Sequence, residues 1–182
     1  LNTESWGYDE TRARAFFDAL DRRLREQPSI GHVSFAQLAP LVSTPSGGTI
    51  TVTRGGERVR VAIESTIVGP RFFETLGIPV IAGRAFDDTD GPMGPAVAVV
   101  SDTFAKQVFP DELDVVGRTF DMSDSRVTIA GVVGDAKWGE IDEPPVPLVY
   151  LAVAQRWPSS QTLFVTSADS AVAARAVIEA VR

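Results

Sequence analysis

The chain has 182 residues, of which 44% are hydrophobic and 23% charged, so its composition is that of a folded globular protein. The net charge of −7 argues against a nucleic-acid partner and against docking on anionic lipid through a basic patch. The absence of cysteine excludes disulfides, thiolate nucleophiles and cysteine-based metal sites. The chain starts at Leu1 rather than Met, without an apolar run long enough to span a membrane. We therefore expect a segment excised from a longer protein.

The first third of the chain predicts one helix followed by strands. Apolar residues at helical spacing predict a helix over residues 8–27, and Asp9 is well placed to be its N-cap. The segments after this helix carry strand and turn signals. They are a strand at 31–38, a loop at 43–48, and a hairpin of strands 49–53 and 57–68 that turns at residues 54–56 (Arg-Gly-Gly).

The rest of the chain predicts short helices between short strands. A helix over residues 69–77 ends at Gly77, which suits a C-terminal cap. Ser101 is the expected N-cap of a second short helix over residues 102–109. The remaining predicted elements are strands at 78–81, 96–100, 120–122, 127–133, 149–153 and 163–166, an extended segment at 139–147, and a last helix up to residue 182.

The order of these elements fits a split α/β unit with a middle stretch inserted into it. A helix–strand piece comes first, a strand-rich stretch follows, and a strand–strand–helix piece ends the chain. A complete unit needs a strand before its first helix, so we expect the chain to begin just after that strand or to keep a remnant of it.

Residues able to carry catalysis are scarce. His32 is the single histidine, so every Ser-His-Asp arrangement would have to use it. We expect no catalytic residue and no cofactor. Gly131 and Gly134 follow a strand, but they do not match the dinucleotide-binding pattern of glycines before a helix. We interpret them as marks of a bulge or of a close backbone approach.

The acidic turn at residues 87–91 is the best metal candidate in the sequence. Asp87, Asp88 and Asp90 resemble part of a calcium loop, but the bidentate glutamate of such a loop is missing. A polar turn is the simpler interpretation, and we expect no metal. A hydrolase that uses these three carboxylates is an alternative, with their replacement by alanine as its test.

Two tryptophans are the candidate partner contacts. Trp138 and Trp157 lie in segments that resemble loops, where an exposed aromatic side chain often marks an interface. Packing at the edge of the core is the competing interpretation for both. An acidic run beside the first of them offers paired carboxylates without a predicted cleft; it consists of Glu140, Asp142 and Glu143.

Six short stretches of the chain carry recognisable motifs in a consistent order. They are 68–79 (VGPRFFETLGIP), 82–86 (AGRAF), 96–110 (AVAVVSDTFAKQVFP), 115–118 (VVGR), 128–135 (TIAGVVGD) and 147–151 (PLVYL). Together they resemble one family, the MacB-like periplasmic core domain of FtsX/MacB-type ABC transporter permeases. Small departures from the family pattern are Pro70, Ser101 and Ala152, which stand where the family has a tyrosine-containing lead-in, asparagine and proline.

The resemblance implies an α+β domain of two lobes between the first and second membrane helices of a permease. A split βαβ lobe, called porter-like, would comprise residues 1–43 and 141–182. A mixed α/β lobe, called sabre-like, would be inserted at residues 44–140. This boundary agrees with the loop predicted at residues 43–48.

The resemblance also implies a role in transport rather than in catalysis. The domain would lie in the periplasm while its permease sits in the inner membrane, and it would transmit motion driven by a cytoplasmic ABC ATPase during export. Its partners would be the membrane helices of the same permease, that ATPase, and a periplasmic adaptor or a second permease copy in a homodimer. The alternative is an extracytoplasmic ligand-binding or sensor domain for a peptide or a lipid-like molecule.

Overall fold

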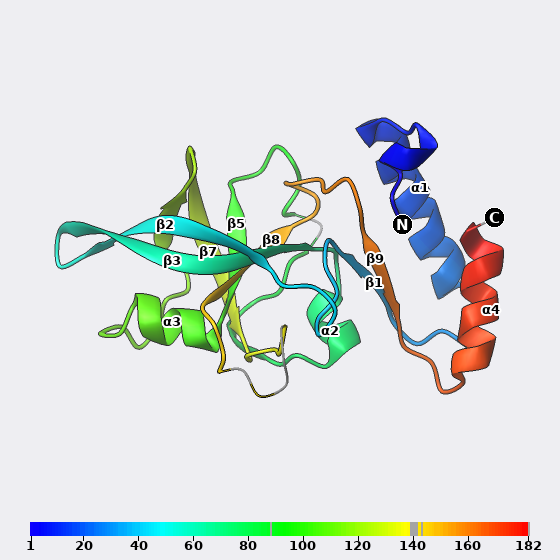
Figure 1. Ribbon diagram of the computed structural model, residues 1–182. Coiled ribbons are helices and arrows are strands. Elements are labelled where there is room, and N and C mark those ends of the chain that lie inside the picture. Colours follow the sequence, from blue (N-terminus) through cyan, green and yellow to red (C-terminus); the bar gives the residue numbers. More distant parts are fainter. Residues whose placement is uncertain (88, 139–141, 143, 182) are drawn as a thin grey trace.

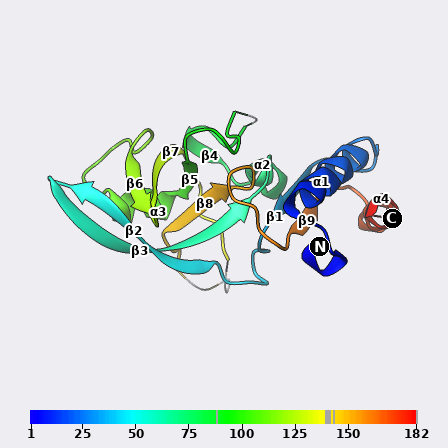
Figure 2. The ribbon, with the colours of Figure 1, turned by 90° about the horizontal axis from the view of Figure 1, so that it is seen from above.

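The computed structural model describes residues 1–87, 89–138, 142 and 144–181, and these form two parts that lie end to end (Figure 1). The smaller part, here called the end unit, carries both chain termini. The larger part, here called the body, extends away from it to the tip of a long hairpin (Figure 2). The end unit consists of a short 3-10 helix (Glu4–Trp6), α1 (Glu10–Arg25), β1 (Val33–Ala36), β9 (Thr162–Val165) and α4 (Ser170–Val181).

The body is built from the segments between β1 and β9. Its strands are mostly short, except for the hairpin strands and β7. Its elements are β2 (Ser46–Arg54), β3 (Glu57–Val68), α2 (Phe72–Leu76), β4 (Val80–Gly83), β5 (Val97–Ser101), α3 (Asp102–Val108), β6 (Thr119–Met122), β7 (Ser125–Val133) and β8 (Leu148–Ala152).

One sheet runs through both parts. Its strand order is β2-β6-β7-β5-β8-β3-β1-β9, and β4 pairs with β7 off this path. A further pairing of β2 with β3 closes six of the body strands, all except β4, into a ring. Apolar side chains from all six strands, together with those of α3, form one core cluster. β8 is buried along its whole length because it lies between β3 and β5. β8 falls in the segment 141–182 of the expected division, and its two partner strands lie in the segment 44–140.

The end unit has the layout of a split βαβ unit. Asp9 caps α1 by accepting a hydrogen bond from the backbone N–H of Arg12 at 2.8 Å. The buried stripe of α1, which includes Phe17 and Leu20, packs with α4 against β1 and β9. Leu1 and Asn2 pair antiparallel with the residues just before β9, and β9 pairs on its other side with β1. β9 therefore lies between the first two residues of the chain and β1. The α+β fold expected from the sequence is confirmed.

Several predicted boundaries shift by a few residues. Residues 46–48, expected in a loop, belong to β2, because Gly47 and Gly48 pair with Glu64 and Ile63 of β3. The helix expected from residue 69 begins only at Phe72, since the preceding backbone is left-handed and cannot continue a helix. The segment predicted to be extended at 139–147 lies partly outside the described residues.

The hairpin and the caps follow the sequence pattern. Gly55 and Gly56, at the tip of the hairpin, have φ angles of 55° and 87°, the conformation of the tight turn that two-residue hairpins use. Ser101 caps α3 by accepting from the N–H of Phe104 at 3.1 Å. These local features are confirmed. They could be predicted from the sequence because short-range hydrogen bonds and backbone sterics determine them.

Candidate functional site

The end unit and the body meet at a junction of backbone and side-chain contacts. Its backbone contacts lie where β1 meets the end of β3, at the single register pair of Ala36 with Val68. Gly69 donates a hydrogen bond to the carbonyl of Phe35 at 2.7 Å, and Gln37 donates to the carbonyl of Ile67 at 2.8 Å. A Cβ atom on Gly69 would lie 3.0 Å from the oxygen of Phe35, so this close approach favours glycine.

An aromatic cluster forms the side-chain part of the junction. Phe72, at the start of α2, is fully buried. Its ring centroid lies 5.7 Å from that of Phe164 on β9 and 6.1 Å from that of Tyr150 on β8. One side chain therefore contacts the end unit on one side and the ring of body strands on the other.

Trp138, the first predicted partner contact, belongs to this buried cluster. Its indole stacks on Phe72, its side chain is only 4% exposed, and its Nε1 donates to the hydroxyl of Tyr150 at 3.4 Å. Burial raises the pKa of Tyr150 to about 12, so that the hydroxyl stays protonated at neutral pH. In this structure Trp138 lies in the core, and its role as a partner contact stays a prediction.

Trp157, the second predicted partner contact, lies against the end unit on the connection from β8 to β9. Its ring packs on Phe17 of α1, with centroids 5.6 Å apart. The guanidinium of Arg14 lies 4.6 Å from the ring centroid and donates weakly to the carbonyl of Val153 at 3.4 Å. This half-buried side chain joins α1 to the chain that leaves the body, and a contact with a partner stays a prediction for it too.

The single histidine also lies at the junction. The Nδ1 atom of His32, just before β1, lies 3.4 Å from a carboxylate oxygen of Glu74 in α2, and both side chains are about half exposed. No serine contacts His32 in the hydrogen bonds of the described residues. Its geometry is that of a half-exposed contact between an imidazole and a carboxylate across the two parts, and such a surface contact contributes little to stability.

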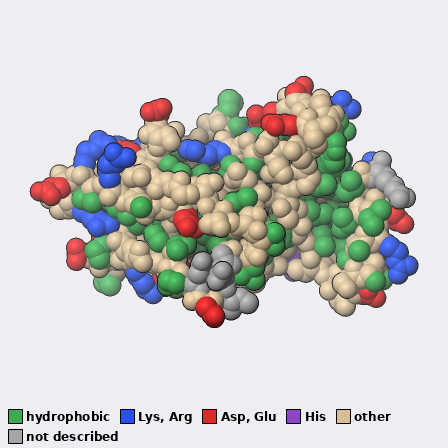
Figure 3. All heavy atoms as spheres, viewed as in Figure 1, with side chains coloured by type: hydrophobic (Ala, Val, Ile, Leu, Met, Phe, Trp, Pro, Cys, Tyr) green, Lys and Arg blue, Asp and Glu red, His purple; other side chains and the backbone are tan. Residues whose placement is uncertain are grey.

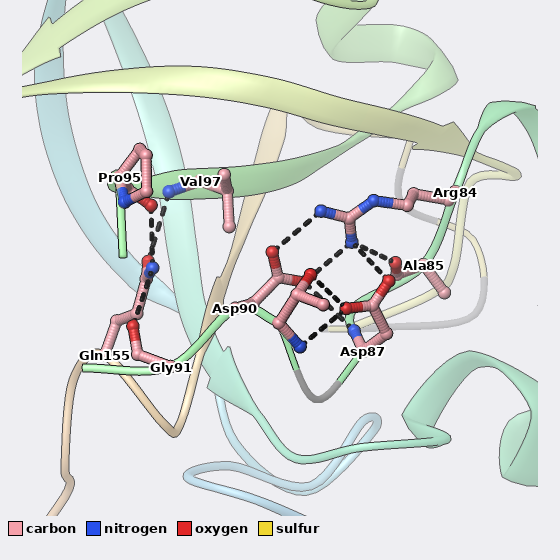
Figure 4. A network of polar contacts seen from close by, with 9 residues as sticks. Arg84, Ala85, Asp87, Asp90, Gly91, Pro95, Val97 and Gln155 are labelled. Atoms are coloured by element: carbon pink, nitrogen blue, oxygen red, sulfur yellow. Dashed lines mark hydrogen bonds and ion pairs between the residues drawn. The ribbon is translucent and has the colours of Figure 1, made fainter. Parts of the chain in front are cut away.

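The acidic turn is held by an arginine (Figure 4). Arg84 donates two hydrogen bonds to the carboxylate of Asp90, at 2.7 and 2.8 Å, and the side chain of Asp90 is 4% exposed. The backbone N–H of Asp87 donates to the same carboxylate at 3.0 Å. The carboxylate of Asp87 in turn accepts from the N–H of Thr89 at 2.8 Å. The carboxylates of Asp87 and Asp90 are thus engaged within the protein.

The remaining acidic residues add no metal site in the part of the chain that the structure describes. Asp88, Glu140 and Glu143 lie outside it. Among the residues inside it, no group of three or more histidines and carboxylates is arranged to hold a metal ion. The turn is better described as a structural loop, which Gln155 fixes further by donating to the carbonyl of Pro95 at 2.8 Å and accepting from Val97 (Figure 4).

Two facing glycines determine where Arg84 lies. Gly83 of β4 is opposite Gly131 of β7, and the N–H of Arg84 donates to the carbonyl of Ala130 at 3.0 Å. A Cβ atom on Gly131 would lie 2.2 Å from the carbonyl oxygen of Arg84. The pairing of β5 with β7 also shifts register next to Gly131. The bulge and close approach predicted at Gly131 are confirmed.

Replacing Asp90 with asparagine should destabilise the protein at neutral pH by about 2 kcal/mol, since two charge-assisted hydrogen bonds are weakened in a buried place. Hydrogen bonds from Arg84 lower the pKa of Asp90 below its ordinary value of 3.8. A lowered pKa gives stability that is present above the ordinary value and is lost as the pH falls through the folded value. The difference between wild type and variant should therefore shrink below about pH 4.

Urea unfolding at a series of pH values measures this effect. Asp87→Asn is the matched control, because Asp87 lies in the same turn with a half-exposed side chain. An equal loss in both variants, or a difference that does not depend on pH, would contradict the assigned role of Asp90.

An apolar groove lies along α4 and β9, at the end of the molecule that carries both termini. It encloses a volume of about 520 Å³, and its lining contains no charged side chain. The sequence predicted the last helix but not a groove beside it. Its apolar lining residues are Leu1, Leu163, Val165, Ala173, Ala174, Val177, Ile178 and Val181.

No helix in the described part of the chain combines the length and the apolarity that a membrane crossing needs.

Comparison with known families gives one match over nearly the whole chain. The family described as the MacB-like periplasmic core domain matches residues 5–182. Among curated proteins, the chain is 31% identical over 120 residues to the macrolide export ATP-binding/permease protein MacB of Shewanella oneidensis, covering 62% of this chain. It is also 31% identical over 153 residues to the protein of the same name from Rhodospirillum rubrum, covering 79% of this chain. The matched regions span 18% and 23% of those two relatives.

Solved structures show the same fold at low sequence identity. The periplasmic region of MacB from Actinobacillus actinomycetemcomitans superposes with a TM-score of 0.63 at 19% identity, over 89% of this chain and 71% of that one. The extracellular domain of the noncanonic ABC-type transporter YknZ from Gram-positive bacteria gives a TM-score of 0.54 at 12% identity, over 86% of this chain and 75% of that one.

Proposed function

The chain belongs to the family of MacB-like periplasmic core domains, and from this premise we propose that it transmits ATPase-driven motion to a partner or substrate in the periplasm during export. The observation that carries the proposal is the continuous sheet between the chain termini and the hairpin tip. Strands are stiff along their length, and the twelve residues of β3 alone span about 40 Å. Force applied at the termini would therefore reach the far end of the body.

The junction supports transmission because it joins the parts by several kinds of contact. Backbone hydrogen bonds connect β1 to β3, the ring of Phe72 packs against Phe164, and Arg14 stacks on Trp157. A linker without such contacts would let the end unit turn freely. We propose that the end unit and the body move together. The expected division into residues 1–43 with 141–182 and residues 44–140 stays a proposal, and it differs from the end unit and body in grouping β8 with the chain ends.

The partners follow from the position of such a domain in a permease. We propose that the full-length protein lies in the inner membrane, that its membrane helices continue from this domain, and that a cytoplasmic ABC ATPase drives it. A second permease copy or a periplasmic adaptor would receive the motion. ATP hydrolysis belongs to the ATPase in this proposal, and the domain itself carries no catalytic residue.

Spin-label distances in the full-length permease, reconstituted with its ATPase, test the proposal. The domain has no native cysteine, so labels can be placed at Asp18 in the end unit and Glu57 near the hairpin tip. We expect the distance between these two labels to stay constant when ATP is added. The distance from Glu57 to a label in the membrane part should change. An ATP-independent distance to the membrane part would refute transmission.

A ligand-binding or sensor role is the second candidate, and the groove along α4 and β9 is the observation that favours it. A pocket of this volume with apolar walls suits a peptide or a lipid-like molecule. A macrolide is a reasonable first probe, because the names of the two MacB relatives include macrolide export. A melting temperature that rises with probe concentration would favour this role over transmission alone.

A further inference from the structure

A line of polar side chains crosses the outer face of four body strands. Ile50 of β2 lies in the body core, so its neighbour Thr51 points outward. Thr51 pairs with Arg60 of β3 on one side and with Asp121 of β6 on the other. Asp121 in turn pairs with Arg126 of β7. Residues opposite each other share one face of a sheet, so these four form one row, about 14 Å long over three strand spacings.

This face carries more positive than negative charge. The carboxylate of Asp121 accepts hydrogen bonds from Arg58 at 2.9 Å and from Arg126 at 3.3 Å. The side chains of the two arginines are still 68% and 72% exposed, whereas that of Asp121 is 29% exposed. Arg60 is exposed as well, so three arginines accompany one aspartate. The whole chain has a net charge of −7, so this face is opposite in sign to the molecule as a whole.

Threonine hydroxyls lie between and beside the arginines. Thr53 of β2 pairs with Arg58, and Thr119 of β6 pairs with Thr128 of β7. Arginine offers five N–H donors and no acceptor, and a hydroxyl can also donate. Carboxylates only accept, and they fit the forked guanidinium geometry. The chemistry of the face is therefore complementary to a carboxylate-bearing ligand.

We propose that this face, here called the arginine face (Arg58, Arg60 and Arg126 with the threonines between them), binds an acidic, extended segment of a protein partner. The middle of the row holds Asp121, so a partner carboxylate there would be repelled. Two carboxylates belong over Arg60 and Arg126, at the ends of the row. In an extended segment, residues four apart point to the same side and lie about 13 Å apart, which matches the row. The residue halfway between them is neutral.

The place of the arginine face in the molecule favours a protein partner over a membrane. Both termini lie in the end unit, whereas the hairpin strands extend away from it (Figure 2). Lys and Arg side chains are visible around the hairpin end of the surface (Figure 3). The inference rests on the proposed function, in which membrane helices continue from the termini and motion reaches the far end of the body. A partner segment bound there would receive that motion.

A peptide titration of the chain of residues 1–182, followed by amide chemical shifts, tests the proposal. The probe is a short capped peptide with two glutamates separated by three serine or threonine residues. It should shift the amides of Thr51, Arg60 and Arg126, and added salt should weaken its binding because the charges are exposed. A peptide of the same composition with adjacent glutamates should bind more weakly.

Three results overturn the proposal. Equal binding of the two peptides refutes the matched spacing, and shifts centred on α1 instead of the arginine face refute the site. A larger response to phosphatidylglycerol vesicles than to the peptide assigns the face to a membrane. Shifts of the same amides that grow with protein concentration, without peptide, assign it to a second copy.

Charge reversal at the ends of the row tests the residues. Arg60→Glu combined with Arg126→Glu should weaken peptide binding at least about tenfold, because two attractive pairs become repulsive. Arg22→Glu combined with Arg175→Glu is the matched control: it changes the net charge equally at exposed positions of the end unit and should bind like wild type. Equal losses in the two double variants overturn the proposal.

A milder pair of changes keeps the test valid if the reversed variant folds poorly. Arg60→Gln combined with Arg126→Gln removes the charges without adding repulsion, and it should still weaken binding at least about threefold. Unchanged binding in this variant overturns the proposal. Failure of the peptide to bind would leave the ATP-dependent spin-label distances unchanged, so this inference and the proposed function fail separately.

Discussion

Replacing Phe72 with alanine should lower the free energy of unfolding by about 3–5 kcal/mol, because it empties a fully buried ring position in the middle of the junction. The ring contacts the body through Trp138 and Tyr150 and the end unit through Phe164. The cavity would therefore weaken the contact between the parts as well as the core. Urea unfolding followed by tryptophan fluorescence measures the loss.

Phe104→Ala is the matched control for this change. Phe104 is also fully buried, but its ring contacts Phe109 and Phe120 within the body. Both variants should lose a similar amount of stability. Only Phe72→Ala should also accelerate hydrogen exchange in β9, because the ring of Phe104 does not extend to this strand. Equal exchange of β9 in the two variants would contradict the junction role of Phe72.

Replacing Gly131 with alanine should destabilise the protein by about 3 kcal/mol, although it adds a single methyl group. The new Cβ atom would lie 2.2 Å from the carbonyl oxygen and 2.9 Å from the nitrogen of Arg84, and both are backbone atoms that no side-chain rotation can move away. β4 would have to separate from β7, which would also displace Arg84 from Asp90. Denaturation midpoints measure the cost.

Gly47→Ala is the control for the glycine effect itself. Gly47 also lies in a strand, and a Cβ atom there would have no neighbour within 4 Å. Alanine at this position should be neutral or slightly stabilising, since it restricts the unfolded chain. If Gly131→Ala were as well tolerated as Gly47→Ala, the close approach of β4 and β7 would not be essential to the fold.

A variant that combines Gly131→Ala with Asp90→Asn should lose less unfolding free energy than the sum of the losses in the two single variants, because both changes act through Arg84.

The region around Gly131 shows which features a local sequence pattern can predict and which it cannot. Gly131 interrupts a run of β-branched residues, and a glycine at such a place predicts a bulge or a close neighbour. The pattern does not say which backbone lies close. That neighbour is Arg84, 47 positions earlier in the chain, and it is brought there by the pairing of β4 with β7. Arg84 in turn explains why the acidic turn is a structural loop.

The sequence by itself determined the features that depend on neighbours along the chain. The caps at Asp9 and Ser101, the glycine turn of the hairpin and the apolar stripe of α1 all rest on short-range hydrogen bonds or on helical spacing. The motifs also indicated the family, because six short stretches in a fixed order are far more specific than any one alone. The α+β order of elements followed from the same local signals.

Only the tertiary structure decided which strands meet and which side chains are buried. Trp138 has the local sequence of a loop residue, yet it is buried because α2 and β8 pack around it. β8 follows a proline-rich segment near the chain end, yet it pairs with β3 and β5 in the body. The place of β9 at the end of the sheet path likewise depends on strand order. Pairing between distant segments is selected by how well whole surfaces fit, and local sequence carries little information about that fit.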